Sequence, residues 1–428
     1  MCATCPSFAG NEEQGAPVDV LSCAAFPVNS AEDLDILLDR AGECRLVLLG
    51  EASHGTSEFY TWRSDISRRL IEEKGYAFIA VEGDWATLYR LNRYVKGLEG
   101  AGDGAREIMK EFDRWPTWMW ANEEMVSLIE WMREYNADLP EGNRIGFYGM
   151  DVYGPETSYR KVLDLIEEWG LQQAYAVREY YACLEDFEDD FAMYGRAVSF
   201  GMAPCDEQVL AVVELLDGIG PDSGISGTDH LNLLQNAWVV KNAEKHYRAM
   251  GVHGPHSWNH RADHFFQTIE RLLEFYGHDS KGVVWAHNTH VGDARATDMA
   301  SQGRRNIGQI AREQLGSNRV FSVGFGTHRG TVMAGRSWGG DREIMNVPPG
   351  ISGSYEEIMH LMGKDEALIM LEDIKEDPLM LESRGHRAIG VVYHPEREHL
   401  GNYVPTVLPR RYNAFLFIDE TRALSPVH

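Results

Sequence analysis

The sequence is short of positive charge. Lys and Arg number 40 against 66 Asp and Glu, which gives a formal net charge of −26. Proteins that bind nucleic acid carry a basic surface, so this composition argues against a nucleic-acid partner. The same acidic balance disfavours an anionic membrane surface or a highly anionic substrate.

Long apolar runs are missing as well. No run approaches the roughly 20 apolar residues that a membrane-spanning helix needs. The N-terminal sequence MCATCPSFAG has neither the basic region nor the apolar core of a secretory signal. We therefore expect no membrane partner and a cytoplasmic location.

Cysteine is sparse, with six in 428 residues, and its scattered positions are typical of a reducing compartment. Cys2 and Cys5 form a C-x-x-C pair, but neither a second pair nor a following helix supports a zinc or redox site. We interpret residues 1–25 as a flexible N-terminal segment. With 44% apolar residues, the remaining chain, 26–428, is expected to form one domain.

Short apolar segments that end in glycine or polar residues predict buried parallel strands. Helical patterns over Ser57–Lys74, Ala86–Lys96 and Glu123–Tyr135 separate the first of them. This alternation predicts an α/β fold with a mostly parallel sheet flanked by helices. The predicted strands are 45–50, 77–83, 144–151, 282–288 and 319–326, with two weaker ones at 387–394 and 413–419.

From about residue 158 to 276 the strand signals stop. Apolar residues there recur at helical spacing, broken by turn clusters rich in glycine and proline. We predict a large all-helical insertion within the α/β domain, covering the edge of the sheet and shaping the substrate pocket.

Ionisable side chains follow several predicted strands at the point where each strand ends. In an open parallel sheet, ligands bind outside the carboxyl ends of the strands. Each of these residues taken alone fits a helix cap or a loop hydrogen bond, but their repetition from strand to strand predicts a joint site. The candidates are Glu51, His54, Glu82, Asp151, His287, His290 and His328.

Aromatic residues near these positions suggest an apolar substrate cleft. Trp85 follows Glu82 closely, and Trp118 lies in the aromatic stretch RWPTWMWANEE, Arg114–Glu124. A plug of the core at a helix N-terminus explains that stretch equally well. GRSWG, residues 335–339, matches the G-x-S-x-G nucleophile elbow, but no helix is predicted after it, so we reject Ser337 as a nucleophile.

Several ordered motifs together resemble the erythromycin esterase family. They are LGEASHGTSEFYTWR, VEGDW, GMDVYG, SWNHRADH, VVWAHNTHVGDARAT, GFGTHRGTV and RSWGG, from about residue 46 to about 340. The resemblance implies an α/β core with helical additions. It also implies hydrolysis of a small-molecule ester or lactone, the lactone ring of 14-membered macrolides by family default, with no metal and no cofactor.

The resemblance also assigns the site residues. His54 corresponds to the key histidine of the family and Glu51 to the glutamate of the same motif. Arg63, Glu82, His287 and His290 correspond to further residues of the family motifs, and we expect His290, Asp151, Trp85, Trp118 and His328 to bind substrate.

A mechanism follows from these residue types. A neutral imidazole suits the activation of water near neutral pH, so His54 is the expected general base. Glu51 or Glu82 would fix its tautomer. Arg63, His287 and backbone N–H groups near Gly55 are the candidate donors to the oxyanion. His287 or His290 would protonate the leaving alkoxide.

Two other classes of function stay open at this point. The carboxylates and histidines could bind Zn²⁺ or Mn²⁺ in a metal-dependent hydrolase. Alternatively, the aromatic cleft could belong to a non-catalytic binder of an apolar ligand. Acyl transfer to an alcohol in place of water is also compatible with these residues, and the sequence indicates no oligomeric state.

Overall fold

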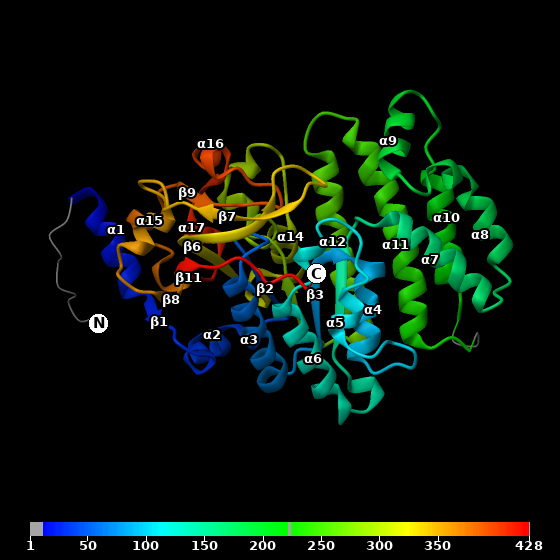
Figure 1. The fold of residues 1–428 in the computed structure, drawn as a ribbon, viewed down its shortest axis with the longest axis horizontal. Coiled ribbons are helices and arrows are strands. Elements are labelled where there is room, and N and C mark those ends of the chain that lie inside the picture. The colour runs from blue at the N-terminus through cyan, green and yellow to red at the C-terminus, as the bar shows by residue number, and fades with distance from the viewer. Residues whose placement is uncertain (1–11, 221–223, 428) are drawn as a thin grey trace.

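A nine-stranded mixed sheet forms the centre of the computed structural model, which describes residues 12–220 and 224–427 (Figure 1). The strand order is β1-β8-β11-β6-β2-β5-β3-β4, and β7 pairs with β6 outside this path. The strands are β1 (Ala25–Pro27), β2 (Leu46–Leu49), β3 (Phe78–Asp84), β4 (Gly146–Asp151), β5 (Gly282–Trp285), β6 (Val320–Gly335), β7 (Arg342–Val347), β8 (Glu366–Ile369) and β11 (Ala414–Thr421).

Six neighbouring strands of this sheet are parallel, from β11 through β6, β2, β5 and β3 to β4. Val47 of β2 pairs with Val283 of β5 on one side and with Phe321 of β6 on the other. All four residues of β2 are buried, as expected for a strand covered on both faces. The predicted α/β class is thus confirmed.

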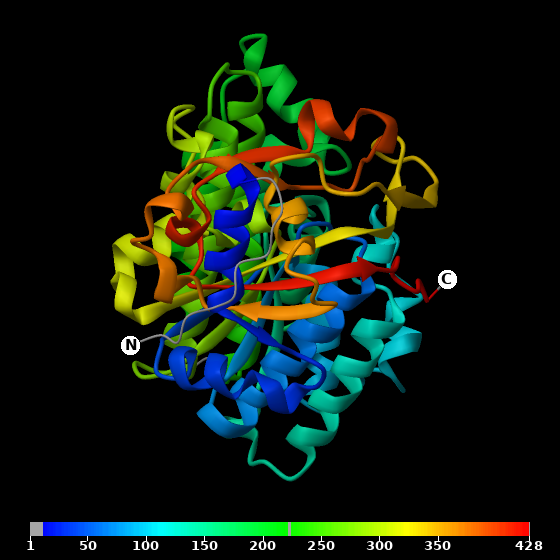
Figure 2. The same ribbon diagram turned by 90° about the vertical axis from the view of Figure 1, so that its left-hand side faces the viewer.

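Alternate residues of the strands enter two different apolar cores, one on each face of the sheet (Figure 2). Val47 and Leu49 pack with helices α2 (Asp35–Ala41), α3 (Ser57–Lys74), α5 (Ala105–Met109) and α6 (Glu123–Ala137). Leu46 and Leu48 pack on the opposite face with α1 (Glu12–Cys23), α12 (His256–Tyr276), α14 (Ile307–Leu315) and α15 (Tyr355–His360). Helix α4 (Trp85–Val95) contributes side chains to both cores.

The all-helical insertion is present between β4 and β5, on the right of Figure 1. Its outer helices bury an apolar core of their own, separate from the two cores of the sheet. The predicted helical run from Leu171 to Tyr194 is interrupted by the short η4 (Ala182–Phe187). The other helices are α7 (Pro155–Glu168), α8 (Ala174–Tyr181), α9 (Phe191–Ser199), α10 (Asp206–Asp217) and α11 (Gly227–Met250).

A disulfide joins Cys183 to Cys205 within the insertion. This pairing differs from the sequence analysis, which interpreted the scattered cysteines as typical of a reducing compartment. The C-x-x-C pair of Cys2 and Cys5 lies outside the described residues. Residues 1–25 were expected to be flexible, but the structure has helix α1 from residue 12 onward. This helix lies beside α15 in Figures 1 and 2, and its Leu21 is fully buried.

One predicted strand, 387–394, is wrong. The structure has β9 (Arg384–Arg387) paired with β10 (Tyr403–Thr406) in a separate two-stranded sheet, and most of the predicted segment is irregular. Two of its apolar side chains are buried nonetheless, because Ile389 and Tyr393 pack with β6 and β7. Three short helices, α13 (Asn288–Val291), α16 (Glu398–Gly401) and α17 (Leu408–Arg411), complete the connections.

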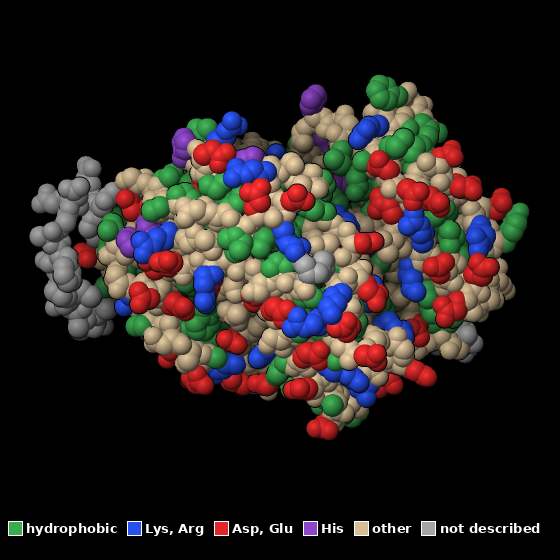
Figure 3. Space-filling model, viewed as in Figure 1, with side chains coloured by type: hydrophobic (Ala, Val, Ile, Leu, Met, Phe, Trp, Pro, Cys, Tyr) green, Lys and Arg blue, Asp and Glu red, His purple; other side chains and the backbone are tan. Residues whose placement is uncertain are grey.

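Acidic side chains are spread over the face shown in Figure 3, with basic ones between them. This distribution agrees with the net charge of −26 and with a well-hydrated surface. Within residues 12–220 and 224–427, no helix is both long and apolar enough to cross a bilayer.

Candidate active site

Four adjacent parallel strands deliver their polar residues to one edge of the sheet. Glu51 and His54 follow β2, Glu82 lies in β3, Asp151 ends β4, and His287 follows β5. Because β2, β5, β3 and β4 are neighbours in the sheet, these side chains meet at the carboxyl end of the strands. The sequence analysis expected this clustering.

A chain of two charged contacts leads to His54. Arg63 lies 2.7 Å from Glu51 Oε2, and Glu51 Oε1 lies 2.8 Å from His54 Nδ1. Since a carboxylate can only accept, Nδ1 of His54 carries the proton and donates it to Glu51. Within the described residues, His54 Nε2 has no hydrogen-bond partner, and His54 lines a pocket. This geometry fits a histidine that accepts a proton from a bound molecule.

The surroundings of His54 favour its charged form. Burial acts to lower the pKa of His54, but the hydrogen bond that His54 donates to Glu51 and the negative charge of Glu82 outweigh it, so the pKa is raised. Of the two glutamates considered, Glu51 is the one that contacts His54 Nδ1. Glu82 acts on His54 through its charge.

Arg63 does not reach the pocket. Its side chain is fully buried, and its guanidinium lies between the rings of Tyr60 and Trp285, 4.3 and 4.6 Å from their centroids. Its contact is with Glu51, on the side away from the pocket. The expected role of Arg63 as an oxyanion donor therefore lacks a geometric basis, and its structural role is to hold the carboxylate that holds His54.

Arg261, from α12 in the insertion, binds two of the strand-end carboxylates. Its guanidinium lies 2.9 Å from Glu82 Oε1 and 2.5 Å from Asp151 Oδ2. His290 Nε2 lies 3.3 Å from both Glu82 Oε1 and Arg261. Burial raises the pKa of Glu82, but the charges of His290, His54 and Arg261 hold it well below its ordinary range. Glu82 is therefore a carboxylate at neutral pH.

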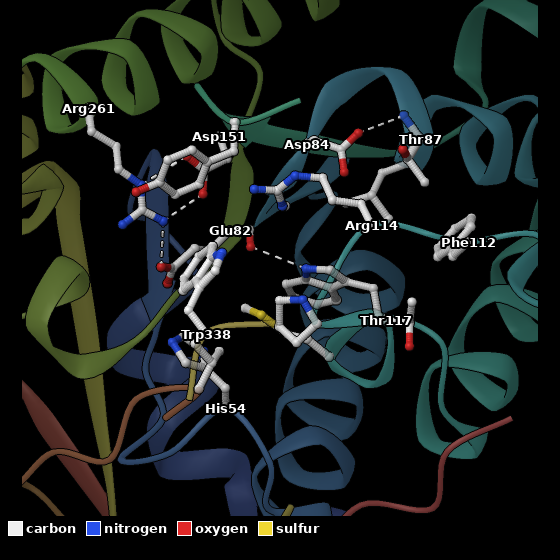
Figure 4. A pocket seen from close by; sticks show the side chains of 17 residues that line it. His54, Glu82, Asp84, Thr87, Phe112, Arg114, Thr117, Asp151, Arg261 and Trp338 are labelled. Carbon is white, nitrogen blue, oxygen red and sulfur yellow. Dashed lines mark hydrogen bonds and ion pairs between the residues drawn. The ribbon is translucent and has the colours of Figure 1, made fainter. Parts of the chain in front are cut away.

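His290 was expected to bind substrate, but it lies beneath the pocket and does not line it. Its ring stacks on Trp258 at 4.7 Å between centroids, and only 3% of the residue is exposed. Asp151, in contrast, does line the pocket beside Arg261 (Figure 4).

His287 stands next to His54, with 5.0 Å between the two ring centroids. The Thr289 amide donates to His287 Nδ1 at 3.2 Å, so the proton of a neutral His287 is on Nε2. Burial and the charge of His54 hold the pKa of His287 well below its ordinary value, although Glu82 and the Ala52 backbone oppose this shift. His287 is thus neutral at neutral pH, and its buried Nε2 makes no well-formed hydrogen bond in the described structure.

The pocket itself opens between the sheet edge and the aromatic stretch that begins at Arg114 (Figure 4). It holds about 800 Å³ of empty volume, including the space open to solvent at its mouth. Its polar lining comprises His54, Glu82, Asp84, Thr87, Arg114, Thr117, Asp151, Tyr153 and Arg261. Its apolar lining comprises Leu88, Phe112, Pro116, Met119, Trp120, Trp338 and Val391.

Neither tryptophan predicted for the cleft lines this pocket. Trp85 is buried against Tyr148, at 5.2 Å between centroids, and donates to Asn232 of α11 at 3.0 Å. Trp118 is buried in the core below α6. The aromatic stretch has both of the expected roles at once, because Trp118 fills the core while the neighbouring Trp120 faces the pocket.

His328 is also remote from the pocket lining. It lies in β6, where its ring stacks on His360 with 3.9 Å between centroids. The Gly350 amide approaches His328 Nδ1 at 3.4 Å. The sequence placed His328 at a strand end, but β6 continues past it to Gly335 and pairs with β7. The strand-end rule therefore did not apply.

Among the pocket residues that the sequence analysis did not predict, three stand out. Arg261 lies in the middle of a helix, and only the motif SWNHRADH marked its vicinity. Arg114 opens the aromatic stretch that was noted for its rings. Trp338 lies in GRSWG, where the serine drew attention, and it is 64% exposed at the pocket mouth.

The insertion contributes less to the pocket than expected. Of its described residues, only Arg261 lines the pocket, and the outer helices α7–α11 supply no lining side chain. The insertion was expected to shape the pocket because it follows β4 directly. It packs instead around its own core.

The arrangement of donor groups bears on the metal-binding alternative. Among the residues that the structure describes, no group of three or more His, Cys, Asp or Glu side chains is placed to hold a metal ion. The guanidinium of Arg261 occupies the position between Glu82, Asp151 and His290 where a cation would sit. These two carboxylates therefore already share a cation that the protein itself supplies.

Comparison with known proteins identifies the family. The family model "Erythromycin esterase" matches residues 71–421, a span that begins after Glu51, His54 and Arg63. The erythromycin esterase type II of Escherichia coli is 29% identical over 143 residues, which are 33% of this chain and 32% of the relative. The chain thus aligns with only about a third of that curated relative.

Solved structures share the fold at low identity. A succinoglycan biosynthesis protein superposes with a TM-score of 0.79 at 21% identity, covering 97% of this chain and 100% of that protein. A mutant of the erythromycin esterase EreC in its open conformation superposes with a TM-score of 0.67 at 16% identity, covering 92% and 95%. With the family model matching most of its length, the chain belongs to the erythromycin esterase family.

Proposed function

We propose that the protein hydrolyses a carboxylic ester or a lactone, with His54 as the general base. The observation that carries this proposal is the chain Arg63–Glu51–His54, which ends in a free Nε2 at the pocket wall. A carboxylate that holds Nδ1–H leaves Nε2 as the basic nitrogen and stabilises the imidazolium once it forms. This is what activation of a water molecule requires.

The proposed reaction begins with a water molecule between His54 Nε2 and the ester carbonyl carbon. Its oxygen forms the new C–O bond while its proton passes to His54 Nε2. The tetrahedral intermediate then breaks the bond to the alcohol oxygen, and His54 returns the proton to that departing alkoxide. In a lactone the same steps open the ring to a hydroxy acid. His54 ends neutral, ready for the next cycle.

His287 is the remaining candidate donor to the oxyanion of that intermediate, although it stands beside His54 and does not itself line the pocket. It is adjacent to His54 and neutral, and its Nε2–H has no well-formed hydrogen bond to give up. A preorganised neutral donor in a dry site stabilises negative charge as it develops. The lowered pKa of His287 makes it a poor acid for the leaving alkoxide, so we assign that proton to His54 instead.

Glu82 and Asp151 complete the site in this proposal without reacting. Arg261 binds both, so its one positive charge is shared between two carboxylates. Their role is to position Arg261, whose charge helps to keep Glu82 ionised beside His54. His290 supports Glu82 from below.

The proposed substrate by family relationship is the lactone of a macrolide. The enclosed part of the pocket, about 160 Å³, is smaller than the roughly 300–1,000 Å³ typical of small-molecule sites, so a macrolide would extend through the open mouth of the pocket. The aromatic and aliphatic wall suits an apolar group of the substrate. The hydrolytic chemistry rests on the site residues, whereas the macrolide assignment rests on the relatives.

The test is incubation of the purified protein with a panel of simple esters and 14-membered macrolides, followed by mass spectrometry, with and without a chelator. Addition of one water to a substrate, unaffected by the chelator and lost in His54→Ala, is the expected result. Loss of turnover on chelation would favour a metal-dependent hydrolase. Binding without turnover in both forms would favour a non-catalytic binder.

A further inference from the structure

Arg114 points into the pocket from the loop between α5 and η2 (Thr117–Met119) (Figure 4). Its guanidinium lies 5.1 Å from the Tyr153 ring centroid, and in the described part of the chain it makes no hydrogen bond or ion pair. Three other arginines of the interior are paired with carboxylates, as Arg63–Glu51, Arg261–Asp151 and Arg387–Glu398. Arg114 is different because its donors face the pocket.

The two nearest carboxylates do not satisfy Arg114. Asp151 is held by Arg261, with contacts of 2.9 and 2.5 Å. Asp84 accepts from the Thr87 amide at 2.9 Å, which caps α4, and it forms no ion pair with Arg114. Burial raises the pKa of Asp84, and the charge of Arg114 opposes this without prevailing. An arginine fork with open donors therefore lies in a partly enclosed site.

The segment that follows Arg114 is fixed at two points. Trp115 donates from Nε1 to the Gly340 carbonyl at 2.9 Å, which ties it to the turn between β6 and β7. Asn122 donates to the Trp118 carbonyl at 3.1 Å and caps α6 through its own side-chain oxygen. A cation that is held in place in advance loses little freedom when it binds an anion.

We propose that Arg114 is a specificity-determining residue that binds a carboxylate carried by the substrate apart from its scissile ester. Arg114 and His54 line the same pocket, so one molecule can contact both. A planar guanidinium with free N–H groups matches a carboxylate in two parallel hydrogen bonds. The other arginine of the pocket, Arg261, is already bound to Glu82 and Asp151, so Arg114 is the cation available to a substrate carboxylate.

The apolar wall defines the rest of the substrate. Phe112, Trp120 and Trp338 present rings to the same space, and Trp338 packs against Trp115 at 4.7 Å between centroids. The substrate class is therefore an ester of an apolar, preferably cyclic or aromatic, molecule that bears one free carboxylate. This inference rests on the proposed function only for the ester; the carboxylate contact is a matter of binding.

The experiment uses two pairs of esters in which one member has a free carboxylate and the other has its methyl ester. The first pair, 4-nitrophenyl hydrogen adipate and 4-nitrophenyl methyl adipate, carries the carboxylate on the acyl side. The second, 4-acetoxybenzoate and methyl 4-acetoxybenzoate, carries it on the alcohol side. Binding of each compound to full-length His54→Ala is measured by calorimetry, so that hydrolysis is not needed.

The expected result is that, in at least one pair, the carboxylate binds about tenfold or more tightly than its methyl ester, as for a charge-assisted pair. That preference should disappear in His54→Ala/Arg114→Gln and return in part with Arg114→Lys, which keeps the charge but loses the fork. The pair of esters in which the preference appears indicates whether the carboxylate of the substrate lies on the acyl side or on the alcohol side of its ester.

The matched control is Arg90→Gln in the same His54→Ala background. Arg90 is an arginine on α4 whose ion pair with Glu111 is on the surface. It should leave the preference unchanged. Equal binding within both pairs, a preference that survives Arg114→Gln, or no binding of any compound would overturn the assignment. Failure of the proposed hydrolysis shows separately, as absence of turnover of all four esters by the unmodified protein.

Discussion

Two histidine–glutamate pairs in this molecule have the same geometry and different surroundings. His54 Nδ1 lies 2.8 Å from Glu51, and His386 Nδ1 lies 2.8 Å from Glu356. The second nitrogen of His386 faces the Asn288 side-chain amide at 3.2 Å, and the residue is fully buried. The second nitrogen of His54 has no protein partner and lies at a pocket.

The pKa values diverge accordingly. Burial lowers the pKa of His386, and Glu356 opposes this without prevailing, whereas the pKa of His54 is raised. The additional charge of Glu82 beside His54 explains part of this difference. A histidine–carboxylate contact is thus no sign of catalysis by itself; what the other ring nitrogen faces decides its use.

Replacement of His54 by Ala should have the largest effect on activity and should separate the two histidine–glutamate pairs most clearly. Loss of a general base lowers kcat by about 10²–10⁴-fold, whereas the fold should be retained because His54 lies at the pocket wall. Ester hydrolysis and thermal unfolding of the same preparation measure the two effects. A variant that keeps near-full activity would remove His54 from the mechanism.

The pH dependence of hydrolysis should also reflect the surroundings of His54. Only neutral His54 accepts a proton, so kcat/KM should rise as pH rises through the pKa of His54, at a midpoint above the ordinary histidine value of about 6.5. Glu51→Gln removes a group that raises this pKa, so the midpoint should move to lower pH. A midpoint that stays in place would mean that another group titrates.

His386→Ala should lower stability and spare activity, the reverse of the result expected for His54→Ala. It leaves the buried Glu356 without its histidine partner, at a cost of about 1–3 kcal/mol in the free energy of unfolding. Activity per folded molecule should stay close to that of the unmodified protein. Denaturant unfolding and hydrolysis rates measure both quantities, and a large loss of kcat without loss of stability would give His386 a part in the chemistry.

The smallest effect is expected for Ser337→Ala. Ser337 lies in the turn between β6 and β7, with no helix after it, so it lacks the geometry of a nucleophile elbow. Hydrolysis should be unchanged in rate and in pH dependence. Loss of activity, or covalent labelling of Ser337 by a serine-directed phosphonate, would replace the water mechanism by an acyl-enzyme.

The sequence predicted the central strands well because burial on both faces makes them uniformly apolar. It missed β7 because most of that strand is exposed, so its sequence lacks the continuous apolar run of a buried strand. It also missed the short strand β8, of which only four residues pair with β11. The segment 387–394 is apolar because it packs on β6 and β7, and composition does not distinguish that from strand pairing.

The candidate site was predictable where strand ends define it. Glu51, His54, Glu82, Asp151 and His287 were found because parallel neighbours bring their carboxyl ends together. Arg261 and Trp338 reach the pocket through the docking of a helix and a hairpin, which sequence spacing does not reveal. His328 failed because its strand does not end where the pattern suggested.

The separate core of the outer helices has a consequence for how this protein can vary. Helices α7–α10 are constrained by their mutual packing, while the chemistry sits on the sheet and is tied to the insertion through Arg261 of α12. Substitutions that preserve apolar volume in those helices leave the pocket lining untouched. Divergence in these outer helices is therefore a poor guide to a change of substrate, and a change at Arg114 or Trp338 is a better one.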